Sequence, residues 1–257
     1  MSMKTIGPDP HGAMSTGTGH SKEDTRHDDE VANRKITLTK EEQDIMDGKQ
    51  GKVLANLMKT VVIYGNAFGA DKLVKLGGNP HTVLMFGPGP LKPVIDIFNE
   101  CADAGLKAYA PYTIDPRPND FYNVEMEPEL QLEFGEAYPL QDALEKAHLR
   151  LGAKDINYWS CTCYWPEVGN APAAGTYLAW SESSAVNYAN SVLGARSNRN
   201  SGGIEMMCNI LGRAPHFGLM TTEGRRAKWL IDVQTEVEPP WSVLGSAIGM
   251  KIGRAHV

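Results

Sequence analysis

Two cysteines separated by one threonine, Cys161 and Cys163, are the first candidates for chemistry in this chain. Residues i and i+2 of an extended segment face the same side, so both thiols would point into one cavity. Thiolate is a preferred ligand of iron-sulfur clusters, but a cluster usually takes three or four cysteines, and common zinc motifs have a wider spacing. The pair alone therefore fits metal ligation and two small buried hydrophobes about equally.

Two arginines, Arg196 and Arg199, bracket Ser197 and Asn198 in a stretch without apolar periodicity. A guanidinium group held on a turn can bind a carboxylate or a phosphate through paired hydrogen bonds, and neighbouring Asn and Ser side chains can orient it. The same composition is typical of a solvated surface turn. The segment is thus a candidate clamp for an acidic ligand, with the surface turn as the alternative.

Glu182 is followed by Ser183 and Ser184. A carboxylate beside two hydroxyls could act as a general base within a hydrogen-bonding cluster. An acidic residue is also common at the start of a helix, where it stabilises the helix dipole. The residues alone favour the helix start.

Helical and extended patterns alternate along the chain, which predicts an α/β fold with a mainly parallel sheet. Thr39 and Glu42 form a capping box before a short helix, and apolar residues at helical spacing follow from Leu54. Such sheets bind ligands at the carboxyl ends of their strands, where His81 and residues 161–164 are expected. Further elements are predicted as strands at 82–86, 106–110 and 156–159 and helices at 91–104 and 140–151.

Composition excludes several classes of protein. The chain has 257 residues, 42% of them hydrophobic and 22% charged, which suits a globular protein with a sizeable core. A net charge of −6 without a basic block argues against a nucleic-acid partner, and no apolar stretch is long enough to predict a membrane span. Four cysteines and no signal-like start favour a reducing cytoplasm. Residues 1–35 are polar and predict a disordered tail.

The order of these fragments resembles the large chain of aconitase X. The motifs are C-T-C at 161–163, G-N at 169–170, W-S-E-S-S at 180–184 and N-S-V-L-G-A-R-S-N-R at 190–199. The likeness runs from about residue 36, through the T-I-D-P-R-P box at 113–118, to about residue 249.

This resemblance implies a hydro-lyase built on a three-layer α/β/α aconitase-like domain with an iron or iron-sulfur centre. Family members dehydrate small hydroxy acids, among them cis-3-hydroxy-L-proline and mevalonate 5-phosphate. A metal can act as a Lewis acid while a base removes the proton α to the carboxylate. Carried over by motif, the metal ligands would be Cys161 and Cys163, and the catalytic residues Glu182, Ser183 and His81. The substrate-binding residues would be Asn66, Ser184, Asn190, Arg196, Asn198 and Arg199.

The chain departs from the family pattern at its end. Further metal cysteines and a small swivelling domain, a separate polypeptide in some members, are expected beyond this point. Residues 251–257 back-translate to the start of a common sequencing adapter, so we expect them to be an artefact. Residues 36–250 would then be an incomplete catalytic region, inactive without a small swivelling subunit or domain. The alternative is a non-catalytic metal-binding or regulatory protein that retains the fold.

Overall fold

A computed structural model describes residues 2–5, 36–83, 91–115, 125 and 127–251. The chain divides into two compact units, residues 22–224 and a smaller unit formed by residues 1–21 and 225–257. The sequence analysis treated residues 36–250 as one region, so the division after residue 224 was not anticipated. All the predicted site residues lie in the larger unit, which is described first.

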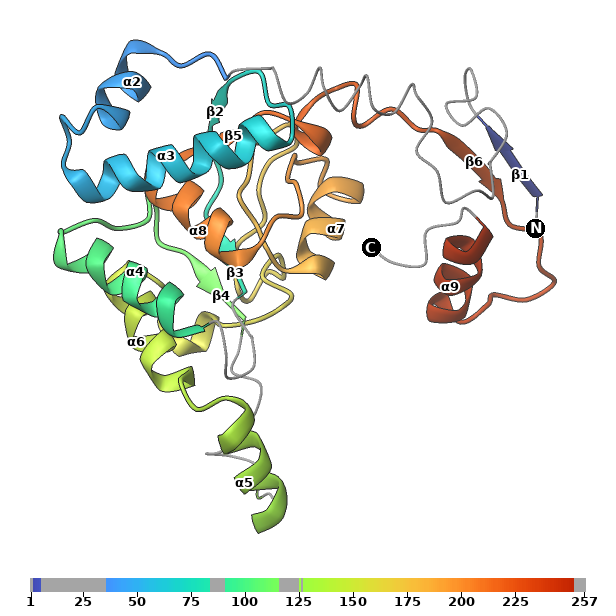
Figure 1. Cartoon of the computed structure of the whole chain (residues 1–257). Helices are drawn as coiled ribbons and strands as arrows, with labels where there is room; N and C mark the ends of the chain where they lie inside the picture. Colours follow the sequence, from blue (N-terminus) through green and yellow to red (C-terminus); the bar gives the residue numbers. More distant parts are fainter. Residues whose placement is uncertain (1, 6–35, 84–90, 116–124, 126, 252–257) are drawn as a thin grey trace, which may run out of the picture. The chain divides into compact units, whose positions relative to one another are not determined.

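Helices are the main regular elements of the larger unit (Figure 1), and local sequence signals set the ends of several of them. Helix α2 begins with the predicted capping box, in which Thr39 Oγ1 accepts from the Glu42 backbone N–H and the Glu42 side chain accepts from the Thr39 N–H. Gly152 follows α6 with φ near +100°, as a helix-ending glycine should. The helices are α2 (Lys40–Met46), α3 (Lys52–Ala67), α4 (Leu91–Asp103), α5 (Pro128–Ala137), α6 (Gln141–Arg150), α7 (Ser183–Ser191) and α8 (Gly202–Leu211).

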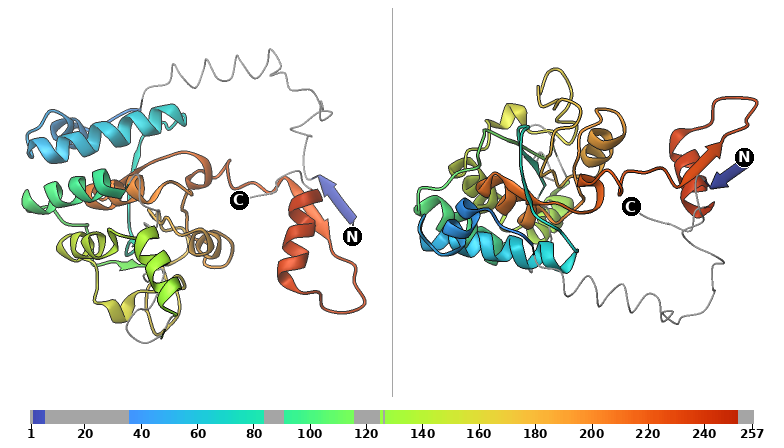
Figure 2. Two further views of the ribbon diagram at one scale, coloured as in Figure 1. Left: turned by 60° about the horizontal axis from the view of Figure 1, so that its bottom comes forward. Right: turned by 90° about the horizontal axis from the view of Figure 1, so that it is seen from above.

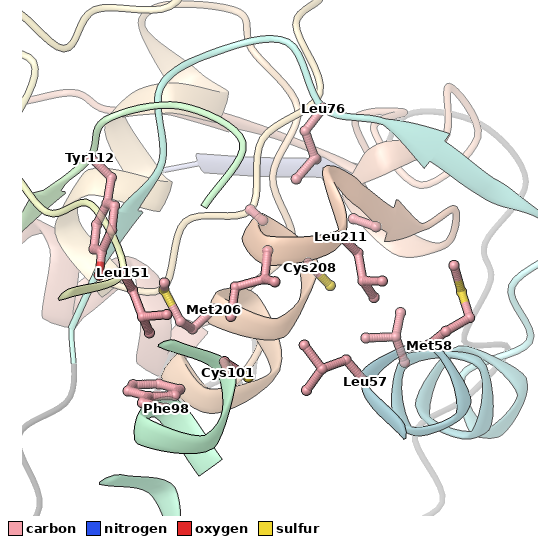
Figure 3. Close-up of a cluster of buried hydrophobic side chains, with 14 of the residues drawn as sticks. Leu57, Met58, Leu76, Phe98, Cys101, Tyr112, Leu151, Met206, Cys208 and Leu211 are labelled. Atoms are coloured by element: carbon pink, nitrogen blue, oxygen red, sulfur yellow. The ribbon is translucent and has the colours of Figure 1, made fainter. Parts of the chain in front are cut away.

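The main hydrophobic core lies between α3, α4 and α8. Figure 3 shows Met58 of α3, Phe98 of α4 and Met206 of α8 pointing into this cluster, and all three are fully buried. Gly65 is required where α3 lies closest to a neighbouring strand, because an added Cβ would lie 2.6 Å from Ile36 and 2.8 Å from Pro215. This close approach packs α3 against Pro215 and the start of the folded region at Ile36.

Short parallel segments form the centre of the unit. Strand β3 (His81–Thr82) pairs in parallel with β4 (Thr113–Ile114), and isolated parallel bridges join Tyr112 to Ala153 and His81 to Trp180. A further parallel bridge joins Tyr177 to Arg196. The central arrangement is therefore parallel, as predicted, while β2 (Leu73–Lys75) and β5 (Arg213–Pro215) add an antiparallel pair.

Helices cover this arrangement. Helix α3 packs on α8, and α4 packs beside α6 (Figures 1 and 2). The combination of helices with a parallel centre is the expected α/β class. Since parallel segments end at the same edge, the residues that follow them are brought together.

Several local predictions were wrong. Residues 106–110 form no strand, and the pairing segment is β4, a few residues later. Residues 156–159 were expected as a strand, but Ile156–Tyr158 form a 3-10 helix. Residues 161–164 form a turn rather than an extended segment, and α5 was not predicted. Of the strand expected at 82–86, residues 84–86 lie outside the described residues, as do residues 116–118 of the T-I-D-P-R-P box.

The smaller unit contains β1 (Ser2–Thr5), β6 (Trp229–Asp232) and α9 (Trp241–Lys251). Strands β1 and β6 pair antiparallel, so the prediction of a disordered tail does not hold for residues 2–5, and residues 6–35 lie outside the described residues. Val243 of α9 is exposed, whereas Leu244 and Ile248 are half-buried. Lys251 closes α9, and the other six residues attributed to adapter sequence lie outside the described part. Among the described helices, none combines the length and apolar character that crossing a membrane requires.

Candidate active site

His81 lies in β3 and is fully buried. Its Nδ1 lies 3.0 Å from Thr113 Oγ1 in the paired strand, and Asn170 Nδ2 donates to the same hydroxyl oxygen at 3.0 Å. Because that oxygen already accepts from Asn170, its own proton is free to point at His81 Nδ1. This arrangement favours the tautomer that carries its proton on Nε2.

Asp115, which follows β4 directly, faces the other nitrogen of His81. The His81 Nε2 and Asp115 Oδ1 atoms are 3.3 Å apart, and both side chains are almost completely buried. The two atoms are not aligned as a hydrogen bond, and neither has another hydrogen-bond partner among the described residues. Sequence reasoning did not select Asp115 as a site residue, although its place directly after a strand was the available signal.

The two cysteines lie on the turn beside this pair. Cys161 is half-buried and within hydrogen-bonding reach of Asp115, whereas Cys163 is buried and within reach of Thr113. Burial, reinforced by the negative charges of Asp115 and Glu182, raises the pKa of Cys161 to about 11 and raises that of Cys163 further. Both thiols are therefore protonated at neutral pH unless a positive charge binds beside them.

Glu182 is the N-cap of α7, which confirms the helix start that the sequence favoured. Its carboxylate accepts from the Ala185 backbone N–H, from Ser184 Oγ at 2.6 Å and from Ser183 Oγ at 3.3 Å. Burial opposes ionisation of Glu182, but these hydrogen bonds and the nearby His81 outweigh it and lower the pKa. The carboxylate is therefore ionised at neutral pH, with the two serine hydroxyls exposed beside it. We refer to His81, Asp115, Cys161, Cys163 and Glu182 as the carboxyl-edge cluster.

A second group of predicted residues forms the segment 197–200, here named the arginine loop. The Ser197 backbone N–H donates to Asn190 Oδ1, and Asn190 Nδ2 donates to the Ser197 carbonyl at 2.8 Å. Asn198 Nδ2 donates to the Phe217 carbonyl at 3.0 Å, and Asn198 Oδ1 accepts from the Leu219 backbone N–H at 2.8 Å. Asn190 and Asn198 therefore hold backbone segments in place, although both were predicted to bind substrate.

The two arginines differ in what their guanidinium groups contact. Arg196 donates to the Met220 carbonyl at 2.9 Å and to Thr222 Oγ1 at 3.3 Å, so its fork is engaged with the protein itself. Arg199 is exposed, and within the described part of the chain its side chain makes no ion pair or hydrogen bond. Arg199 is thus the better placed of the two to meet an anionic ligand.

The last predicted substrate residue, Asn66, lies in α3 rather than in a loop. Its Oδ1 accepts from the Ile36 backbone N–H at 2.9 Å, which ties the start of the folded region to the end of α3. The observed role is therefore structural, and a contact with substrate stays a prediction.

Contacts connect the arginine loop with the carboxyl-edge cluster. The Trp180 indole packs edge-on against the His81 ring, with centroids 5.7 Å apart. The Trp180 backbone N–H donates to Ser197 Oγ at 3.3 Å. Trp180 therefore links Ser197 of the arginine loop to His81 of the carboxyl-edge cluster.

Thiols, carboxylates and imidazole are the donor types that iron and iron-sulfur centres use. Within the described residues, however, no three His, Cys, Asp or Glu side chains converge closely enough to hold a metal ion. The donor types fit an iron centre, but the described residues do not complete one.

A small cavity borders Asp115. Its walls include Thr82, Glu145 and His148, and it has room for no more than about one water molecule. His148 is buried beside Tyr112, whose hydroxyl lies 2.8 Å from His148 Nδ1. Burial lowers the pKa of His148 to about 3, so its ring is neutral at ordinary pH.

Comparison with known proteins identifies the fold. The family model described as the aconitase X first domain matches residues 35–223. The chain is 32% identical over 225 residues to the phosphomevalonate dehydratase large subunit of Thermococcus kodakarensis, covering 84% of this chain and 52% of that protein. It is 28% identical to the cis-3-hydroxy-L-proline dehydratase of Pseudomonas aeruginosa, covering 75% of this chain and 31% of that protein.

A solved structure agrees with these sequence matches. The crystal structure of Thermococcus kodakaraensis aconitase X in its holo form superposes with a TM-score of 0.59 at 29% identity, covering 74% of this chain and 45% of that one. The chain spans about half the length of the phosphomevalonate dehydratase subunits that it matches. The family model extends over most of the larger unit and includes both the carboxyl-edge cluster and the arginine loop. The chain therefore belongs to the aconitase X family.

Proposed function

We propose that this chain supplies part of the active site of a hydro-lyase that dehydrates a small hydroxy acid. The observation that carries the proposal is the convergence of the His81–Asp115 pair, Cys161 and Glu182 at one edge of a parallel arrangement. Dehydration breaks one C–H bond and one C–O bond, forms a C=C bond and releases water. It therefore requires a proton acceptor, a proton donor and a group that holds the substrate anion.

The residues of this chain suit these requirements to different degrees. Glu182 is ionised and can accept a proton, but its cap hydrogen bonds weaken it as a base. Ser183 and Ser184 present hydroxyls beside it, and His81 carries a proton on Nε2, where it faces Asp115. Arg199 would bind the carboxylate or phosphate of the substrate. Arg196 would stabilise the same segment through its hydrogen bonds to Met220 and Thr222.

The thiols are proposed to serve a cofactor. Cys161 and Cys163 would supply two thiolate ligands of an iron or iron-sulfur centre, which would provide Lewis-acid chemistry at the substrate hydroxyl when bound. The positive charge of the metal would also reverse the unfavourable ionisation of these thiols. The remaining ligands would come from residues other than those described.

The relatives support a proposal for the partner and the substrate. Those named phosphomevalonate dehydratase are large subunits, which supports a small partner chain. Their match is longer and closer than that of the hydroxyproline enzyme, which favours mevalonate 5-phosphate as substrate. Because this chain spans about half their length, we propose that turnover requires sequence equivalent to their other half together with the small partner.

Calorimetric titration of the 257-residue protein with mevalonate 5-phosphate, and separately with cis-3-hydroxy-L-proline, tests the proposal. We expect saturable binding of the phosphorylated acid that Arg199→Ala abolishes and Arg150→Ala retains. Arg150 is the matched control, an arginine on α6 whose guanidinium pairs with Asp103. Absence of binding, or binding indifferent to Arg199→Ala, would contradict the proposal.

A second arm tests the cofactor. Anaerobic reconstitution with iron and sulfide should give visible absorption that Cys161→Ser and Cys163→Ser each reduce strongly. Cys101→Ser is the control, because Cys101 is a buried core thiol of α4. Equal absorption in all the variants would remove the two thiols from the cofactor site.

A further inference from the structure

The arginine loop is pinned at its far end by a buried acid that none of the predicted roles uses. Tyr64 Oη of α3 donates to Asn200 Oδ1 at 2.8 Å, and Asn200 Nδ2 donates to Glu205 Oε1 of α8 at 2.7 Å. The Asn200 amide thus bridges α3 and α8, two helices that pack on each other. Both ends of its side chain are engaged.

Glu205 is fully buried, and among the described residues no cation pairs with it. Its Oε2 has no hydrogen-bond partner among the described residues, and an ionised carboxylate in such a place would be costly. Burial, which the Asn200 hydrogen bonds only partly offset, raises the pKa of Glu205 well above its usual value. The titratable groups that face it are Tyr64 of α3 and Cys208 of α8, and burial keeps both of these protonated too.

These hydrogen bonds hold the residues on both sides of Arg199 but not the Arg199 side chain itself. Ser197 and Asn198 are buried and held at one end of the arginine loop, and Asn200 is held at the other. Arg199, between them, is exposed and uncommitted within the described residues. A residue whose backbone is fixed on both flanks loses less backbone freedom when its side chain binds a ligand, and this improves affinity.

We propose that the Tyr64–Asn200–Glu205 chain of hydrogen bonds is a positioning device that holds Arg199 ready for an anionic ligand, with Glu205 acting as a neutral acid. The ligand role of Arg199 rests on the proposed function. The fixed conformation of the arginine loop does not rest on the proposed function. The positioning role and the proposed function can therefore be tested separately.

Cleavage by trypsin between Arg199 and Asn200 reports loop order directly, because a protease must free the segment from its anchors before it can cut. Cleavage after Lys228, an exposed residue outside the loop, serves as the internal reference. Glu205→Ala and the milder Tyr64→Phe should each speed the Arg199 cut by about tenfold, the effect of losing one hydrogen bond. Glu205→Gln should cut at the wild-type rate, since a neutral amide keeps the acceptor.

Asn209→Ala is the matched control. Asn209 lies one turn along α8, is equally buried and donates to the Ala179 carbonyl, but among the described residues its side chain makes no hydrogen bond with the loop. It should lower global stability without a selective rise in cleavage at Arg199. Equal acceleration by Asn209→Ala, or no acceleration by Glu205→Ala and Tyr64→Phe, would overturn the positioning role.

The neutral state of Glu205 has its own measurement. A carboxyl whose pKa is raised on folding costs stability as pH rises above its unfolded value near 4.5. The Glu205→Gln variant should therefore match the wild type near pH 4 and become the more stable of the two toward pH 8. A variant less stable than the wild type at pH 8 would mean that Glu205 is ionised and would overturn the assignment. If the tryptic results hold while Arg199→Ala leaves substrate binding unchanged, the positioning device stands and the proposed function fails.

Discussion

The carboxyl-edge cluster and the arginine loop are built from different kinds of polar group. The cluster and the cavity beside it bury groups that can change charge, among them Asp115, Cys163 and His148. The loop is held mainly by amides, hydroxyls and backbone groups, and its carboxyl anchor, Glu205, is buried with a raised pKa, so these hydrogen bonds depend little on pH.

This difference suits the two regions to different tasks. Buried titratable groups respond to a nearby charge, as proton transfer and metal binding require. A neutral network fixes geometry, as anion binding requires. We therefore expect pH to act mainly on the first region and loss of a hydrogen bond to act mainly on the second.

The largest effect should come from His148, beside the cluster. Its pKa is about 3 in the folded protein against 6.5 for the free side chain, so the unfolded state binds the extra proton first as pH falls. Stability should decline from about pH 6.5 toward pH 3, by up to about 4 to 5 kcal/mol from this group alone. Urea denaturation at a series of pH values measures the decline. His148→Asn should flatten the curve in this range, and an unchanged slope would show that His148 is not buried neutral.

Removing Asn198 should give the next largest effect. Asn198→Ala removes the partner of the part-buried Phe217 carbonyl and of the Leu219 N–H, and the loss of these two hydrogen bonds should cost about 1 to 2 kcal/mol. The adjoining Gly218 has φ near +53°, and an added Cβ would lie 2.7 Å from Asn198 Oδ1. The backbone at Gly218 is therefore fitted closely to the Asn198 side chain. The loss should be the same at pH 5 and pH 8 in denaturation experiments. A strongly pH-dependent loss would erase the distinction between the two regions.

A smaller effect should appear in thiol chemistry. Asp115→Asn removes a negative charge beside Cys161, so the pKa of that thiol should fall from about 11, although burial keeps it elevated. Its alkylation by iodoacetamide at pH 8.5 should become several-fold to about tenfold faster. Mass spectrometry of the modified peptides measures the rate.

Cys101 provides the control for this experiment. Its pKa is also about 11, but mainly through burial in α4, with Glu100 as the nearby charge. Its rate should not respond to Asp115→Asn. A parallel rise at Cys101 would indicate general opening of the fold instead of an electrostatic effect.

Helices were predictable from sequence because their signals are local. The capping box of α2, the apolar repeat of α3 and the glycine after α6 each act within a few residues. The strands were harder, since β3 and β4 are only two residues long and propensity has little to act on. Residues 156–159 are an equally short segment and were predicted as a strand, although Ile156–Tyr158 form a 3-10 helix.

The site was predictable in composition but not in contacts. The motifs contained His81, Glu182 and both cysteines, and the parallel pattern suggested a shared edge. The pairing of Asp115 with His81 depends on the register of β3 and β4, which no local signal specifies. Likewise, the engagement of Arg196 by Met220 and Thr222 depends on how a later segment returns to the loop.

The smallest expected effect compares the helix caps of the two regions. Glu182 caps α7 with a carboxylate, and Ser201 caps α8 with a hydroxyl that accepts from the Ile204 N–H. Each residue changed to alanine should cost about 1 kcal/mol at pH 7. Because the pKa of Glu182 is lowered on folding, its contribution is present above the unfolded value near 4.5 and is lost as pH falls through the folded value. The cost of Glu182→Ala should therefore shrink in acid, while that of Ser201→Ala stays constant. Denaturant midpoints of both variants at pH 7 and pH 3.5 give the comparison, and a Ser201→Ala cost that also fell in acid would mean that general destabilisation, not the charge of the cap, produces the difference.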